Sequence, residues 1–234
     1  MELKGKVALV TGSTRGIGRA IADLLAQRGV KVITNSSQSE NKSRGLEFDY
    51  LKADVSNNSD LEVMFKHIKD KYGKLDILIN NAGVYLKEDL IFSEDYQVYE
   101  KFHKVNGWGV YLCSNLASKL MKKGKIVNIS SIYGIQPNET SMIASGVKSE
   151  VESYTKSFAR KFKGRIEVNS VAPGYVNTFL VRKSLTKKEI LNVVAKNSRK
   201  RLITAQEISK AVVFLLENDG ITGQTIVVDD GCLL

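Results

Sequence analysis

The sequence contains few of the residues that form metal sites, disulfide frameworks or chain kinks. Its 234 residues include two cysteines, two histidines, two prolines and one tryptophan. Cys113 and Cys232 are too few for a disulfide framework, and we interpret them as reduced thiols of a cytoplasmic protein. Neither cysteine has a metal-ligand spacing, and His67 and His103 have no partner cluster. We therefore expect no metal site.

Long apolar runs are also absent. No stretch of about 18 apolar residues occurs, which argues against a membrane-spanning helix. Residues 1–6 lead directly into a strand-like run, without the charged and then apolar leader of an export signal. There is no internal repeat, low-complexity tract or linker, so we expect residues 1–234 to form a single domain.

The net charge of +10 raises the question of a nucleic-acid or membrane partner. The basic residues are scattered, and many lie near the expected carboxyl ends of helices, where they complement the helix dipole. The densest run, residues 197–201, has no aromatic residue within it. We expect a solvated surface that helps to attract an anionic cofactor or substrate, with no nucleic-acid or membrane partner.

Apolar β-branched runs alternate with stretches of helical periodicity throughout the chain. This alternation predicts an α/β fold, a Rossmann-type doubly wound parallel sheet of about seven strands with helices on both faces. Ligands of such sheets bind beyond the carboxyl ends of the strands. Both prolines, Pro137 and Pro173, fall in expected loops. The expected strands are 7–10, 30–34, 50–55, 75–79, 125–129, 165–172 and 225–228; the expected helices are 16–28, 59–72, 96–122 (one long helix or two joined ones), 145–162, 187–196 and 205–217.

A glycine-rich segment lies between the first expected strand and the first expected helix. Gly12, Gly16 and Gly18 are spaced Gly-x-x-x-Gly-x-Gly, which lets the backbone turn tightly and approach a pyrophosphate. The helix that follows offers free amides and the positive end of its dipole. The segment therefore predicts a dinucleotide phosphate site formed by Gly12, Ser13, Thr14, Arg15, Gly16, Ile17 and Gly18.

Further short motifs follow the other strands in order. They are Asp54-Val55, Asn80-Asn81-Ala82-Gly83, Asn106, Asn128-Ile129-Ser130-Ser131, Pro173-Gly174-Tyr175-Val176-Asn177-Thr178 and the run from Thr222 to Gly231. With the glycine-rich segment they resemble the short-chain dehydrogenase/reductase family over essentially the whole chain. The resemblance implies that the cofactor contacts Asp54, Val55, Asn81, Ala82, Gly83, Lys148, Pro173, Gly174, Val176 and Thr178.

The end of the second expected strand bears on the choice of nicotinamide cofactor. A carboxylate there would bind the ribose hydroxyls of NAD and repel a 2′-phosphate. The sequence has Asn35 and Ser36 instead, and Arg15 lies in the glycine-rich segment, where NADP-preferring members of the family often carry a cation. Hydroxyl, amide and guanidinium donors suit a phosphate. We expect NADP(H), the alternative being a solvent-facing loop with an unrelated arginine.

Enzymes of the family that this sequence resembles transfer a hydride between nicotinamide and a carbonyl or alcohol carbon. A tyrosine four residues before a lysine gives or takes the proton, aided by a serine and an asparagine. Ser131, Lys148 and Asn106 occupy the serine, lysine and asparagine positions. Counting forward thirteen residues from Ser131, or back four from Lys148, gives Ala144. The sequence therefore lacks the catalytic tyrosine, and no other Tyr-x-x-x-Lys occurs in it.

Three explanations of Ala144 are open. The first is an engineered inactivation, which the retention of Ser131, Lys148 and Asn106 favours. The second is a natural loss of the tyrosine in a binding protein. In the third, another group serves as the acid. Tyr133 and Tyr154 are the phenols nearest in sequence, and of these Tyr133 follows Ser131 most closely. General acid catalysis contributes about 10²–10⁴-fold, so its loss should cripple turnover without affecting cofactor binding.

The leading hypothesis is an NADP(H)-dependent oxidoreductase whose chemistry Ala144 impairs. The glycine-rich segment, the Asn-Asn-Ala-Gly run and the length resemble the 3-oxoacyl-carrier-protein reductase branch, which implies a 3-oxoacyl thioester substrate. Positive charge would favour an acyl-carrier-protein or coenzyme A thioester. The alternative is a non-catalytic NADP(H)-binding or sensing protein. The resemblance also implies a homo-oligomer, tetramer or dimer, that pairs through the helices at 96–122 and 145–162.

Overall fold

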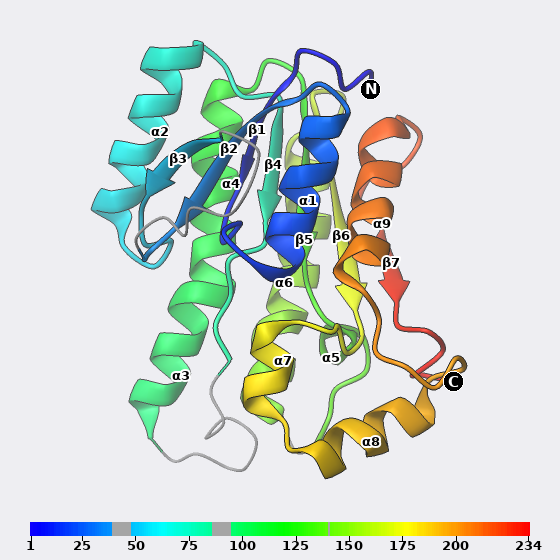
Figure 1. The fold of residues 1–234 in the computed structure, drawn as a ribbon. Coiled ribbons are helices and arrows are strands. Elements are labelled where there is room, and N and C mark those ends of the chain that lie inside the picture. Colours follow the sequence, from blue (N-terminus) through cyan, green and yellow to red (C-terminus); the bar gives the residue numbers. More distant parts are fainter. Residues whose placement is uncertain (39–47, 86–94, 140) are drawn as a thin grey trace.

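A parallel sheet of seven strands forms the centre of the molecule (Figure 1). The computed structural model describes residues 1–38, 48–85, 95–139 and 141–234. The strand order is β3-β2-β1-β4-β5-β6-β7, so the direction of winding reverses between β1 and β4. This confirms the predicted doubly wound sheet. The strands are β1 (Val7–Val10), β2 (Lys31–Ser36), β3 (Asp49–Lys52), β4 (Ile77–Asn80), β5 (Gly124–Ile129), β6 (Ile166–Pro173) and β7 (Thr225–Val228).

Helices cover both faces of this sheet (Figure 1). The longer ones are α1 (Gly16–Gln27), α2 (Asn58–Tyr72), α4 (Gly109–Leu120), α6 (Met142–Lys161) and α9 (Ala205–Glu217). Along β1, Ala8 and Val10 join the core beneath α1 and α9, whereas Val7 and Leu9 join the core beneath α2, α4 and α6. Both faces of each central strand are buried, which is why the sequence shows apolar runs there and no alternation.

Local signals set the bounds of α2 close to those predicted. The Asn57 side chain accepts hydrogen bonds from the amides of Ser59 and Asp60, at 2.9 and 3.3 Å, and caps the first turn. Gly73 ends the helix in the left-handed conformation, at φ 69°. Among the helices that the structure describes, none is both long enough and apolar enough to cross a membrane.

The long helical segment predicted at 96–122 is a continuous helix with an inserted wide turn. It consists of α3 (Tyr96–His103), the π-helical turn η2 (Lys104–Trp108) and α4. Asp95 caps its start by accepting a hydrogen bond of 2.8 Å from the Gln97 amide. Wide turns of this kind are frequent at functional sites, and η2 contains Asn106.

The structure departs from the sequence-based prediction most clearly in three short segments, and α6 also begins at Met142 and not at Ser145, so that it contains Ala144. Two helices were not predicted, α5 (Ile132–Ile135) and α7 (Phe179–Ser184), because each is too short to show helical periodicity. The prediction that Pro173 lies in a loop was wrong, because β6 extends to it. Pairing of β6 with β5 ends at Val171, so the missing amide hydrogen of Pro173 breaks no bond of that ladder. Figure 1 shows α7 and α8 (Lys187–Lys196) beyond the carboxyl ends of the strands.

Candidate active site

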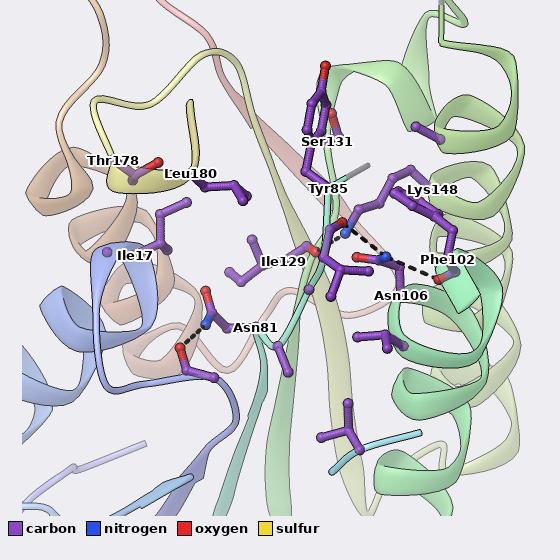
Figure 2. A pocket seen from close by; sticks show the side chains of 18 of the residues that line it. Ile17, Asn81, Tyr85, Phe102, Asn106, Ile129, Ser131, Lys148, Thr178 and Leu180 are labelled. Atoms are coloured by element: carbon purple, nitrogen blue, oxygen red, sulfur yellow. Dashed lines mark hydrogen bonds between the residues drawn. The ribbon is translucent and has the colours of Figure 1, made fainter. Parts of the chain in front are cut away.

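A cleft of about 960 Å³ opens at the carboxyl ends of the strands, where ligands of parallel α/β sheets bind. Loops that follow β1 to β6 line it, together with parts of α3, η2, α6 and α7. Figure 2 shows Ile17 and Thr178 on one side of this space and Asn106 and Lys148 on the other. We call the side formed by residues 12–17 and by the end of β2 the phosphate half. The side formed by Asn106, Ser131, Ala144 and Lys148 is called the catalytic half.

The glycines of the phosphate half are required by close backbone contacts. Gly12 and Gly16 have φ values of +61° and +59°, which disfavour a residue with a side chain. A Cβ on Gly12 would lie 2.7 Å from the Ala82 Cα. A Cβ on Gly18 would lie 2.4 Å from Asn81 Nδ2 and 2.6 Å from the Gly12 carbonyl oxygen. The loop is therefore held in contact with the segment that follows β4.

Asn81 fixes this contact with its side chain. Its Nδ2 donates hydrogen bonds to the carbonyl oxygens of Thr11 and Gly12, at 2.9 and 3.0 Å. Figure 2 shows Asn81 turned toward this loop. The Thr11 hydroxyl in turn accepts hydrogen bonds of 3.0 Å from the amides of Asn81 and Ala82. The Asn-Asn-Ala-Gly run thus shapes the phosphate loop from its neighbouring strand.

The first turn of α1 provides amides and no competing side chain. Arg15 stands at the N-cap position and makes no capping hydrogen bond, and the first turn holds no acidic residue in the described structure. By contrast, α8 and α9 each begin with a complete capping box, built on Thr186 and Thr204. The start of α1 therefore combines free amides with a positive dipole end at the cleft, which is the arrangement that binds phosphate.

The end of β2 carries hydroxyl and amide groups. The residues there that line the cleft are Asn35, Ser36, Ser37 and Gln38, and none of these four described residues has a carboxylate. The Asn35 side chain is buried and donates hydrogen bonds of 3.0 Å to the carbonyl oxygens of Leu51 and Ala53. Its side chain thus holds β3 in place, while Ser36 and its neighbours provide the accessible polar groups.

Three polar side chains meet in the catalytic half. Ser131 caps α5, and its Oγ accepts a hydrogen bond of 3.2 Å from the Tyr133 amide. Lys148 lies on α6, and its Nζ donates a hydrogen bond of 3.0 Å to the Ile129 carbonyl oxygen. Burial lowers the pKa of Lys148 to about 8, an effect that the Glu152 carboxylate partly offsets.

Asn106 completes this group from the π-helical turn. Its Nδ2 donates hydrogen bonds to the carbonyl oxygens of Val84 and Phe102, at 3.2 and 3.1 Å. The side chain is 2% exposed and lines the cleft. These bonds fix its orientation, which Figure 2 shows beside Lys148.

Ala144 lies one helical turn before Lys148 on the same face of α6, and it lines the same cleft. It is 7% exposed and packs in a small apolar cluster with Phe102 and Val147. At this position the catalytic half therefore has a methyl group and no proton donor.

Comparison with known proteins gives consistent matches over nearly the whole chain. The family model described as enoyl-(acyl carrier protein) reductase matches residues 12–232. The 3-oxoacyl-[acyl-carrier-protein] reductases FabG of Vibrio cholerae serotype O1 and Escherichia coli K12 are 36% and 35% identical to this chain over 244 residues, covering 99% of it and 98% of each relative. The chain belongs to the short-chain dehydrogenase/reductase family.

Solved structures extend the likeness to three dimensions. Ligand-free aldohexose dehydrogenase of Thermoplasma acidophilum matches with a TM-score of 0.91 and 30% identity, covering 99% of this chain and 95% of that one. A structure of ribose-5-phosphate isomerase from Brucella melitensis 16M matches with a TM-score of 0.93 and 30% identity, covering 100% and 94%. Proteins that share this fold are thus named for different activities, a dehydrogenase and an isomerase, so the fold alone does not identify a substrate.

The cleft brings together most of the residues that the sequence predicts for a short-chain dehydrogenase/reductase site. Ser13 and Gly18 do not line it. The Ser13 hydroxyl is buried and donates a hydrogen bond of 2.7 Å to the Val10 carbonyl oxygen, and Gly18 backs the loop against Asn81. The predicted site residues that line the cleft are Gly12, Thr14, Arg15, Gly16, Ile17, Asn35, Ser36, Asp54, Val55, Asn81, Ala82, Gly83, Asn106, Ser131, Ala144, Lys148, Pro173, Gly174, Val176 and Thr178.

Sequence reasoning missed several residues that line the cleft. Tyr175 stands between two predicted cofactor contacts, Gly174 and Val176, and this placement was the only signal that could have marked it. Phe179 and Leu180 belong to α7, which had no periodicity to reveal it. Residues that line the cleft without having been predicted as site residues include Ser37, Gln38, Tyr85, Phe102, Ser130, Tyr175, Phe179, Leu180 and Val181, while Tyr133, which the sequence offered as a phenol close to Ser131, lines it too.

Proposed function

We propose that this protein is an NADP(H)-dependent oxidoreductase acting on a carbonyl or a secondary alcohol, and that Ala144 impairs its chemistry. The observation that carries this proposal is the joining of the two halves in one cleft. An uncapped helix start with a glycine loop faces a site that retains Ser131, Lys148 and Asn106. The residues present fit a dinucleotide, because a Cβ at Gly12 or Gly18 would disrupt the phosphate cradle.

NADP(H) is favoured over NAD(H) by the charge at the phosphate half. The Arg15 guanidinium lies over the Phe179 ring, 5.3 Å from its centroid, at the rim of the cleft. Ser36 and Ser37 offer hydroxyl donors nearby, and a carboxylate that would repel a 2′-phosphate is missing from the described end of β2. A guanidinium with hydroxyl neighbours is suited to a phosphate monoester.

When bound, the nicotinamide supplies or accepts the hydride. The Ser131 hydroxyl would polarise the substrate carbonyl from the start of α5. Lys148, which lines the cleft, would hold the nicotinamide ribose, and Asn106 would keep the wall beside it fixed through its two backbone hydrogen bonds. These groups orient the reactants, and general acid help would normally add about 10²–10⁴-fold.

A 3-oxoacyl thioester is the substrate class that we favour. The curated relatives named above are 3-oxoacyl-[acyl-carrier-protein] reductases. On α7, Phe179 and Leu180 are 60% and 43% exposed and line the cleft, which gives an acyl chain an apolar contact. Lys183 and Lys187 lie close by in sequence and would attract an acidic carrier protein or a coenzyme A thioester.

A second candidate function is non-catalytic binding or sensing of NADP(H). The buried Ala144 methyl favours it, because the catalytic half has no proton donor at this position while the phosphate half is complete. Such a protein would bind the cofactor tightly and turn over no carbonyl compound.

An assay of this chain beside Ala144→Tyr separates the two functions. NADPH consumption would be followed with acetoacetyl-coenzyme A and ethyl acetoacetate, and NADP⁺ reduction with D-glucose, since one structural relative is an aldohexose dehydrogenase. We expect slow reduction by this chain and a gain of about 10²-fold or more in Ala144→Tyr. Tight NADPH binding without turnover by either protein would overturn the oxidoreductase function and favour the sensor.

We also propose a cytoplasmic homo-oligomer, a tetramer or a dimer, formed by a single domain of residues 1–234. The proposed pairing surface includes α3, where Tyr96 and Tyr99 are 69% and 41% exposed. Aromatic side chains at such exposure are common at protein interfaces. Two cysteines are too few for a disulfide framework, which favours a reducing compartment. Sedimentation at micromolar concentration tests the oligomer.

A further inference from the structure

Two phenols from different elements meet in the wall of the cleft. Tyr133 belongs to α5, and Tyr175 follows β6. Their hydroxyls are hydrogen-bonded to each other, and their rings meet edge to face with centroids 6.2 Å apart. Both residues line the cleft that also contains Ala144. The site thus lacks a phenol on α6 but has a hydrogen-bonded pair of phenols on the neighbouring loops.

The chain places Tyr133 next to the group that would polarise a carbonyl. Its amide donates the hydrogen bond that the Ser131 Oγ accepts, at 3.2 Å. The two residues therefore occupy one turn, and the start of α5 presents a hydroxyl and a phenol to the same space. Tyr154, the other phenol close to Ala144 in sequence, is arranged differently. It donates a hydrogen bond to Glu150, packs against Tyr111 and Phe158, and does not line the cleft.

A buried hydroxyl lies close to the same phenol. Ser141 is 1% exposed, and its Oγ has no hydrogen-bond partner of good geometry among the described residues. It lies near enough to the Tyr133 hydroxyl to influence its pKa. The Tyr133 phenol is therefore held by its hydrogen bond with Tyr175, and the Ser141 hydroxyl is a second polar neighbour.

The protonation state of the pair suits a donor. Burial raises the pKa of Tyr133, and burial together with the hydrogen bond shared with Tyr133 raises that of Tyr175 further. Both phenols therefore keep their protons at neutral and moderately alkaline pH. A protonated phenol can protonate an oxygen that becomes an alkoxide, whereas it is a poor base for the reverse reaction.

We propose that Tyr133, positioned by Tyr175, donates the proton to the substrate oxygen in place of a phenol at position 144. The proposal rests on the proposed oxidoreductase function. As the carbonyl carbon accepts the hydride of NADPH with its two electrons, the carbonyl oxygen takes the Tyr133 proton. The phenol O–H bond breaks and the alcohol O–H bond forms. The resulting phenolate regains a proton from Tyr175, which takes one from solvent, and the products are the alcohol and NADP⁺.

The test is a cycle of four proteins: this chain, Tyr133→Phe, Ala144→Tyr and the double variant. Each would be assayed with NADPH and acetoacetyl-coenzyme A under single-turnover conditions, with NADPH affinity measured separately by its fluorescence. We expect Tyr133→Phe to slow this chain by about 10²-fold, because general acid help is lost. The same substitution should lower the rate far less in the Ala144→Tyr background, because the new phenol at position 144 donates the proton. Tyr154→Phe, a phenol outside the cleft, should leave the rate unchanged.

Three outcomes would overturn the role of Tyr133 while leaving the oxidoreductase function intact. In the first, Tyr133→Phe keeps the full rate. In the second, Tyr133→Phe lowers the rate by the same factor in this chain and in Ala144→Tyr, as the loss of a merely structural residue would. In the third, this chain is inactive and Ala144→Tyr is active. Failure of every protein to bind NADPH would instead contradict the proposed function itself.

A second measurement covers the case in which Ala144→Tyr does not fold. The single-turnover rate of this chain in deuterated and ordinary water should show a normal solvent isotope effect, because proton transfer from Tyr133 accompanies hydride transfer. Tyr175→Phe should retain most of the NADPH affinity and lower this rate, since it removes the partner that orients and reprotonates Tyr133. An isotope effect near one, with no loss in Tyr175→Phe, would contradict the proposal.

Discussion

The phosphate half and the catalytic half of the cleft differ in how much of their expected chemistry they retain. In the phosphate half, the glycines, the uncapped start of α1 and the donors at the end of β2 are all in place. In the catalytic half, Ser131, Lys148 and Asn106 are arranged around an alanine methyl. The first half consists mainly of backbone, so it is disrupted by adding a side chain at a glycine and not by removing one. The second half consists of side chains, and a single change can remove its acid.

The two halves therefore tolerate substitution in different ways. The proposed binding at the phosphate half would depend on the absence of side chains, because any added atom at Gly12 or Gly18 has a steric cost. Chemistry at the catalytic half depends on the presence of particular groups, so a loss can leave the fold intact and the cleft open. Ala144 shows the second case, since it packs with Phe102 and Val147 without disturbing α6.

The largest effect expected in the phosphate half follows from Gly18→Ala. The new Cβ would lie 2.4 Å from Asn81 Nδ2 and 2.6 Å from the Gly12 carbonyl oxygen, so the phosphate loop must shift. We expect NADPH affinity to fall by about 10²-fold or more, on the order of 3 kcal/mol. Titration calorimetry with NADPH measures it. Unchanged affinity would show that this close contact does not shape the cradle.

Gly146→Ala is the matched control for that experiment. Gly146 lies on α6 between Ala144 and Lys148, and a Cβ there would meet nothing within 4 Å. We expect unchanged NADPH affinity and a gain in stability of about 0.5–1 kcal/mol, because alanine favours a helix interior over glycine. The same chemical change should thus have opposite consequences at two glycines near the same cleft.

The same contrast explains what could be predicted from the sequence. The strands and the phosphate loop were predictable, because burial on both faces and glycine spacing leave local patterns. The alanine at position 144 was found by counting from Ser131 and Lys148. The Tyr133–Tyr175 pair could not be predicted, because α5 and the segment after β6 are brought together only by the sheet. The buried role of Asn35 was likewise hidden, since its partners lie on another strand.

Arg15→Ala tests the cofactor preference with a smaller expected effect. If Arg15 binds the 2′-phosphate as proposed, removing its guanidinium takes away a charge-assisted contact, so NADPH affinity should fall about tenfold while NADH affinity stays level. The difference should shrink as salt is added, because Arg15 is exposed. Arg19→Ala serves as the control, since Arg19 pairs with Asp23 and does not line the cleft. An equal loss for NADPH and NADH would place Arg15 elsewhere on the cofactor.

Lys148 allows the catalytic half to be tested through stability and not through turnover. Burial lowers its pKa from 10.5 to about 8, so the folded protein bears a cost whenever this lysine is charged. The full shift corresponds to about 3 kcal/mol. Loss of the hydrogen bond to the Ile129 carbonyl oxygen and of the attraction to Glu152 would offset part of the gain in Lys148→Met. We expect Lys148→Met to stabilise the protein by about 1 kcal/mol at pH 7, a rise in Tm of roughly 2–4 °C.

The pH dependence of the stabilisation in Lys148→Met identifies its physical origin. Between pH 8 and 10.5 the unfolded chain holds the Lys148 proton more tightly than the folded protein does, so the stability of this chain rises with pH in that window. The cost is fully present below pH 8 and fades toward 10.5, so the advantage of Lys148→Met should be largest at pH 7 and shrink by pH 9.5. Denaturant unfolding of both proteins at the two pH values measures it. A constant difference would attribute the gain to packing. A difference that closes with pH would show that the gain comes from removing the charge of Lys148 in the folded protein.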